Sequence, residues 1–101
     1  MIVAFSVSPS GGEPDGGVSE AVARAVKVVR ESGLPNSTNA MFTNIEGESW
    51  DEVMDVVKRA VEAAGEGSAR VGLVLKADIR PGFSGQLEAK VDRVEARLRD
   101  A

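Results

Sequence analysis

Apolar and polar residues alternate over residues 2 to 9 and again over residues 70 to 79. A period of two is typical of β-strands that bury one face. Residues 34 to 46 are also strand-like, and we expect two short strands there that meet near residues 41 to 43. No Asn-Gly or Asp-Gly pair marks the turn between them, so its position stays open by several residues.

Three other segments space their apolar residues three or four positions apart, as amphipathic helices do. They cover residues 18 to 32, 49 to 64 and 86 to 99. The predicted buried stripes are Val18, Val22, Val26 and Val29 in the first helix, Trp50, Val53, Met54, Val57, Val61 and Ala64 in the second, and Leu87, Val91, Val94 and Leu98 in the third.

End signals support the first two helices. Ser19 is the expected N-cap of the first, and Gly33 stands where a left-handed C-terminal cap belongs. Ser49 and Glu52 have the spacing of a capping box. Pairs of opposite charge four residues apart lie on the outer faces: Glu20–Arg24, Lys27–Glu31, Asp55–Arg59 and Lys58–Glu62.

The order strand, helix, strand, strand, helix, strand, helix predicts the α+β class, with a ferredoxin-like β-α-β-β-α-β sandwich plus a C-terminal helix. We expect residues 1 to 101 to form a single domain. Its four-stranded antiparallel sheet would carry two helices on one face only. The other face, with Ile2, Ala4, Ser6, Gly72 and Val74, would then contact a second copy in a homo-oligomer.

Composition narrows the chemistry. The chain has no cysteine and no histidine, which excludes thiolate nucleophiles, His-based triads and zinc sites built from these residues. We expect no metal site, no cofactor and no catalytic residue. The net charge of −4, with twelve scattered Lys and Arg residues, speaks against nucleic acid as a partner. No apolar run is long enough for a bilayer and no leader pattern is visible, so we expect no membrane contact and a cytoplasmic location.

Two further segments have open interpretations. Residues 10 to 17 contain four glycines before the first helix, and we expect a connecting turn, with an anion site at the helix N-terminus as the alternative. Lys76, Asp78 and Arg80 form a row of charges along the last strand. An exposed row adds little stability, whereas one covered by another subunit would position a partner or a polar ligand.

Hydrogen-bonding side chains crowd into residues 38 to 47, where Asn39, Thr43 and Glu46 stand among apolar neighbours such as Met41. Small-molecule sites are usually composed in this way. The alternative is an exposed polar face of an antiparallel sheet. Ser6 or Ser8, on the open face of the first strand, is expected to line the same cavity from a neighbouring subunit, and Ser8 is the one included in the ligand-binding set.

The run Asn39-x-Met41-x-Thr43-x-Ile45-Glu46-Gly47, followed by Arg70-Val71 and Lys76-x-Asp78-x-Arg80, resembles the small thiamine-binding protein family over nearly the whole chain. The resemblance implies a ferredoxin-like fold and a homotetramer of paired dimers. It also implies that thiamine or its hydroxymethylpyrimidine moiety is bound between subunits, without established catalysis. The family usually has glycine where this chain has Phe42, a ring that would narrow the pocket or stack on the ligand.

On an aminopyrimidine, Glu46 would accept a hydrogen bond from the amine, and Asn39 would donate and accept. Thr43 would satisfy a remaining polar atom, while Met41 or Phe42 packs on the ring. The resulting ligand-binding set is Ser8, Asn39, Met41, Thr43 and Glu46.

Two other functions stay open. One is a regulatory or structural homo-oligomer without a small-molecule ligand. The other is an enzyme with Glu46 or Asp78 as general base beside Lys76.

Overall fold

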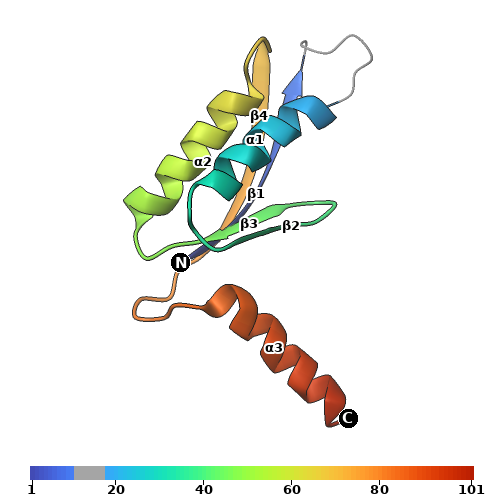
Figure 1. Ribbon diagram of the computed structural model, residues 1–101, viewed down its shortest axis with the longest axis vertical. Coiled ribbons are helices and arrows are strands. Elements are labelled where there is room, and N and C mark those ends of the chain that lie inside the picture. The colour runs from blue at the N-terminus through green and yellow to red at the C-terminus, as the bar shows by residue number, and fades with distance from the viewer. Residues whose placement is uncertain (11–17) are drawn as a thin grey trace.

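The computed structural model describes residues 1 to 10 and 18 to 101, so the glycine-rich segment and its possible anion site lie outside the described residues. The elements are β1 (Ile2–Ser10), α1 (Ser19–Glu31), β2 (Asn36–Thr38), β3 (Thr43–Glu46), α2 (Trp50–Ala64), β4 (Arg70–Asp78) and α3 (Gln86–Arg99). The strands form one antiparallel sheet in the order β2-β3-β1-β4 (Figure 1). This confirms the predicted fold class, β-α-β-β-α-β with an added C-terminal helix.

The pairing of β1 differs on its two sides. Along β4 it pairs from Ile2 to Ser10, whereas along β3 the pairing runs only from Ile2 to Phe5. Phe5 lies opposite Thr43, the first residue of β3. Among the described residues, no strand pairs with that side of β1 beyond Phe5, so backbone groups there are available to a ligand or a partner.

The core lies between the sheet and helices α1 and α2, which pack against each other on one face (Figure 1). Val3, Phe5 and Val7 of β1 are buried there, as predicted. The sheet contributes Ile45 of β3 as its largest fully buried side chain. The helix-facing side of β1 was therefore correctly predicted from alternation alone, whereas Leu73 on the same face of β4 is exposed.

The predicted helix stripes are only partly correct. Helix α1 buries Ala21, Ala25 and Val29, because an alanine methyl group allows close helix packing, while Val22 and Val26 flank the contact. The prediction for Val18 is wrong, since it precedes the helix and is exposed.

Helix α2 buries Val53, Val56, Val57, Ala60 and Ala64. Trp50 is 53% exposed, because the first residue of α2 lies before the helix reaches the core.

The caps of the first two helices agree with the sequence-based predictions apart from Ser19, and one predicted charge pair, Glu20–Arg24, is replaced by other contacts. Gly33 has φ +82°, and the hydroxyl of Ser49 accepts a hydrogen bond from the Glu52 amide at 3.1 Å, as expected. Ser19, however, is already helical and makes no cap. Arg24 does not pair with Glu20 in the same helix. Its guanidinium instead donates to the carbonyl oxygens of Ala63 and Ala64, where the end of α2 leaves such groups unpaired (2.9 and 3.4 Å).

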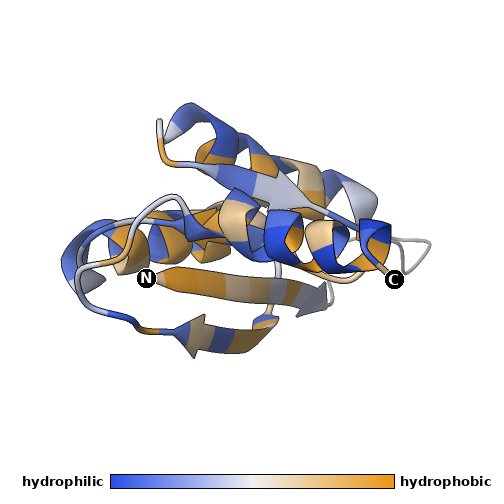
Figure 2. Cartoon of the chain, turned by 90° about the horizontal axis from the view of Figure 1, so that it is seen from below, coloured by the Kyte–Doolittle hydropathy of each residue, from blue (hydrophilic) through white to orange (hydrophobic). Residues whose placement is uncertain are grey.

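Helix α3 extends away from the rest of the molecule, beyond the end of the sheet (Figure 1). It has no buried residue, and its apolar residues Val91, Val94 and Leu98 are exposed. Hydrophobic and hydrophilic residues alternate along the helices and strands, and α3 shows the same mixture (Figure 2). Over the described part of the chain, no helix has the length and hydropathy needed to cross a membrane.

Candidate functional site

Strand β3 separates the predicted site residues. Thr43 pairs with Phe5 and is 7% exposed, so its side chain lies on the helix side of the sheet. Glu46 pairs with Ile2 and lies on the opposite side, because residues three apart in a strand point to opposite faces. The expectation that these two side chains face one slot is therefore wrong.

Four of the five predicted residues nevertheless line one cavity. Ser8, Asn39, Met41 and Thr43 surround a volume of about 290 Å³ between β1, the start of α1 and the turn that joins β2 to β3. We call it the hairpin pocket. Its walls are mostly apolar, with Phe5, Val7, Val18, Val22, Ala25, Val26 and Phe42 among the lining residues. It includes the stretch of β1 beyond Phe5, where β3 has not yet begun and β1 has no neighbour on that side among the described residues.

Asn39 shapes the mouth of the hairpin pocket. Its Oδ1 accepts hydrogen bonds from the backbone amides of Met41 and Phe42 at 2.9 and 3.0 Å. This Asx-type turn sets the position of the hairpin turn, which the sequence left open. Because Oδ1 is already engaged, the group that Asn39 can offer to a ligand is its Nδ2 donor. Met41, at the tip of the turn, is 72% exposed.

The floor of the pocket combines a buried hydroxyl with an open strand edge. The Thr43 hydroxyl makes no hydrogen bond to another side chain or backbone group among residues 1 to 10 and 18 to 101. A buried polar group without a partner costs free energy, about 1–3 kcal/mol. Ser8 lies on the stretch of β1 that β3 does not pair, and its exposed side chain points to the open face of the sheet, opposite to that of Thr43. The Thr43 hydroxyl and the unpaired backbone edge of β1 are therefore available to a bound molecule.

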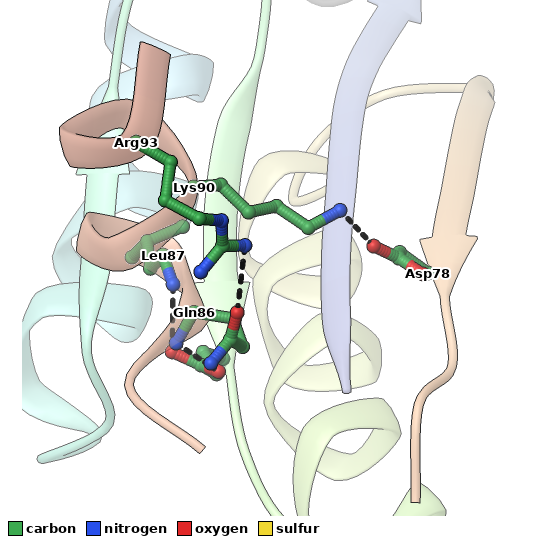
Figure 3. A network of polar contacts seen from close by, with 6 residues as sticks. Asp78, Gln86, Leu87, Lys90 and Arg93 are labelled. Atoms are coloured by element: carbon green, nitrogen blue, oxygen red, sulfur yellow. Dashed lines mark hydrogen bonds and ion pairs between the residues drawn. The ribbon is translucent and has the colours of Figure 1, made fainter. Parts of the chain in front are cut away.

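Glu46 has a different task. Its side chain is 4% exposed, and its two carboxylate oxygens accept hydrogen bonds from the backbone amides of Gln86 and Leu87 at 2.9 and 3.0 Å. These amides are the first of α3, whose N-cap is Gly85 and supplies no side chain (Figure 3). A carboxylate at a helix N-terminus is favourable both as an acceptor and as a charge. Glu46 thus anchors α3 to the open face of the sheet.

A second contact holds the same helix. Lys90 of α3 extends to Asp78 at the end of β4 and forms an ion pair with it (Figure 3). The hydrogen bond from Lys90, together with its charge, holds the pKa of the Asp78 carboxyl below its usual value. On the same helix, Arg93 donates to the side-chain oxygen of Gln86 at 3.0 Å. The predicted row Lys76, Asp78 and Arg80 is therefore not a simple ladder, since its carboxylate pairs with α3.

The start of α3 and the open sheet face enclose a groove of about 600 Å³, which we call the open-face groove. Its polar lining includes Asn39, Asn44, Lys76, Asp78 and Lys90, and its apolar lining includes Ile2, Ala4, Leu87 and Val91. Asn39 also lines the hairpin pocket. Sequence analysis missed the contribution of α3, because no local signal shows that Glu46 and Asp78 reach a helix forty and twelve residues away.

No three acidic side chains gather into a possible metal site within the described ranges. Comparison with known proteins agrees with the sequence motifs. A family model described as thiamine-binding protein matches residues 3 to 95, which confirms the resemblance.

The UPF0045 protein Mb1933 of Mycobacterium bovis is 54% identical over 99 residues, which is 97% of this chain and 94% of that protein. Two solved structures share the fold. The domain of unknown function DUF77 from Bacillus cereus has a TM-score of 0.76 at 34% identity, covering 89% of this chain and 85% of that one. The hypothetical protein MJ1052 from Methanocaldococcus jannascii has a TM-score of 0.80 at 30% identity, covering 93% and 94%.

Proposed function

This chain belongs to the thiamine-binding protein family, and on that premise we propose that it binds thiamine, or the hydroxymethylpyrimidine moiety of thiamine, in the hairpin pocket. The observation that carries the proposal is the convergence of Ser8, Asn39, Met41 and Thr43 on one mostly apolar cavity. Ser8 comes from β1, whereas Asn39, Met41 and Thr43 belong to the hairpin of β2 and β3. Their assembly around a single volume is what a small-molecule site requires.

The chemistry of the pocket suits an aminopyrimidine. The ring nitrogens of such a ligand are acceptors, and Asn39 has a free Nδ2 donor beside them. The exocyclic amine is a donor, and the Thr43 hydroxyl or an unpaired backbone carbonyl of β1 beyond Phe5 can accept from it. Met41 and Phe42 supply the apolar surface against which the ring packs. Glu46 takes no part in this contact and acts instead by positioning α3.

We propose further that the ligand is held at a seam between subunits. The open sheet face exposes Val74, and α3 exposes Val94 and Leu98. A monomer would leave this apolar surface in water, so a second copy is the expected cover. Asn39 lines both the open-face groove and the hairpin pocket, so a subunit docked on the open face would stand beside the ligand. A pair of such dimers would give a homotetramer.

The proposed role is binding without catalysis. Neither carboxylate that was considered as a general base is free to act as one. Both oxygens of Glu46 accept backbone hydrogen bonds, and Asp78 is paired with Lys90. A general base must have a free oxygen within reach of the proton that it removes, and these two carboxylates are already engaged.

Calorimetric titration with thiamine and with hydroxymethylpyrimidine tests the binding site. Asn39→Asp keeps the Oδ1 acceptor of the turn and removes the amide donor, and Thr43→Val removes only a hydroxyl. Each variant should weaken binding about tenfold, the value of roughly one hydrogen bond. No heat with either compound would leave a regulatory or structural oligomer as the better explanation.

Light scattering tests the assembly. Val74→Glu places a charge on the open face and should reduce the molar mass in solution toward that of a monomer. Ala23→Glu, on the exposed side of α1, is the control and should leave the mass unchanged. A monomeric unaltered chain would contradict the proposed seam.

A further inference from the structure

A third cavity, of about 560 Å³, lies between the start of α2 and the segment that follows β4. It shares no lining residue with the hairpin pocket or the open-face groove. Three of its lining side chains are Trp50, Ile79 and Phe83, all large, apolar and exposed. We call it the aromatic pocket. Two aromatic rings on one exposed cavity form a surface suited to a flat ligand.

One wall of the aromatic pocket is a rigid turn. The Phe83 amide donates to the Arg80 carbonyl oxygen at 3.2 Å, which closes a four-residue turn. Pro81 fixes the first central position, and Gly82, with φ +82°, supplies the positive angle that a type II turn needs at the second. The turn therefore places the side chains of its first and last residues, Arg80 and Phe83, next to each other.

Those two side chains are stacked. The guanidinium carbon of Arg80 lies 3.5 Å from the centroid of the Phe83 ring. Stacking uses the face of the guanidinium and leaves its N–H edge free for a planar anion. Within the described chain, no acidic side chain forms an ion pair with Arg80. Among the residues that the structure describes, none accepts a hydrogen bond from the Arg80 guanidinium, so its donors face the pocket without a partner there.

Other charges also bear on the pocket, and one of them is the N-terminal ammonium group of Met1, which lines it. The N-terminus of α2 begins at Trp50 and adds a partial positive charge. Glu48 also lines the cavity and opposes an anion, but its side chain is exposed and free to turn into solvent. Arg80 is held in place by its stack, so the fixed charge of the pocket is positive.

We propose that the aromatic pocket binds a planar aromatic anion. The carboxylate or phosphate of the ligand accepts hydrogen bonds from the edge of the Arg80 guanidinium. Its ring packs against Trp50 and Ile79. This site is separate from the proposed thiamine site and does not depend on it.

The single tryptophan of the chain stands in this pocket, so intrinsic fluorescence reports on it directly. The unaltered protein is titrated with benzoate, with its neutral analogue benzamide, with the non-aromatic anion cyclohexanecarboxylate and with the cation benzylammonium. Benzoate should change the Trp50 emission saturably. The other three should bind at least about tenfold more weakly, since each lacks either the charge-assisted hydrogen bond or the aromatic ring.

Substitutions locate the site. Arg80→Gln should weaken benzoate binding about tenfold, and Phe83→Leu should weaken it through the loss of the stack that orients the guanidinium. Glu48→Gln should tighten it. Arg97→Gln, an exposed arginine in the last turn of α3, is the control and should have no effect. Thiamine titrations of the same variants should be unchanged, which separates failure of this site from failure of the hairpin pocket.

Several results would overturn the proposal. They are a change in emission that grows without saturation, equal benzoate binding by Arg80→Gln, and a preference for benzylammonium over benzoate. Emission that depends on protein concentration without any probe would show that a second copy covers the pocket. If Arg80→Gln fails to fold, the probe series on the unaltered protein still decides between these outcomes.

Discussion

The anchoring of α3 by Glu46 can be tested with one substitution, Glu46→Gln. The carboxylate accepts two backbone hydrogen bonds, from Gln86 at 2.9 Å and from Leu87 at 3.0 Å. Hydrogen bonds to a charged group contribute about 1.5–3 kcal/mol each. Glutamine keeps one acceptor oxygen but turns an NH₂ donor toward the other amide, so about one bond is lost together with the favourable charge at the helix N-terminus.

We therefore expect α3 docking to weaken by about 2 kcal/mol, which is roughly 30-fold in the docking equilibrium. The free energy of unfolding of the rest of the molecule should change much less, because no residue of α3 is buried. A helix of 14 residues is only marginally stable when isolated in water, so an undocked α3 should also lose its own hydrogen bonds.

Amide hydrogen exchange measured by NMR separates these effects, because it reports local opening independently of global unfolding. The measurement uses a protein concentration at which the chain is monomeric. Exchange at Gln86 and Leu87 should accelerate about 30-fold in Glu46→Gln, with a smaller increase along α3. Glu88→Gln, the same change on the exposed first turn of that helix, is the matched control. Equal exchange in the two variants would refute the assignment of Glu46 as the anchor.

Three further predictions concern charge, packing and backbone. Because Lys90 lowers the pKa of Asp78, this ion pair stabilises the fold above the usual carboxylate pKa, and the stabilisation is lost as pH falls through the lowered pKa. Lys90→Met should raise the pKa of Asp78 toward its normal value in an NMR titration. An unchanged pKa would contradict the pairing. Ile45→Val should cost about 0.5–1.5 kcal/mol in urea unfolding, because Ile45 is fully buried, whereas the same change at exposed Ile79 should cost far less. Gly33→Ala should cost about 1–2 kcal/mol in the same assay, since φ +82° is strained for alanine; a neutral effect would argue against this cap.

Local sequence patterns were sufficient to predict the helices, the strands and the buried face of β1. Alternation identified Val3, Phe5 and Val7 as core residues, because in a strand the side-chain direction follows directly from sequence position. The capping residues Ser49 and Gly33 were also readable, since a cap involves neighbours only a few residues away. Helix stripes were harder to predict. Ala21 and Ala25, rather than the larger Val22 and Val26, form the contact of α1, because helix packing depends on the facing surface as well as on hydrophobicity.

The candidate site shows where sequence reasoning reaches its limit. Asn39, Met41, Thr43 and Ser8 line one cavity of a single chain, and their role in ligand binding stays a prediction. Glu46 was assigned to the same surface, but strand register puts it on the opposite face and α3 covers it. The sequence by itself determined the strands, the helices and the buried face, because these depend on short-range periodicity. Only the tertiary structure decided which distant groups meet, because the hydrogen bonds of Glu46 and the turn that stacks Arg80 on Phe83 depend on where the chain returns in space.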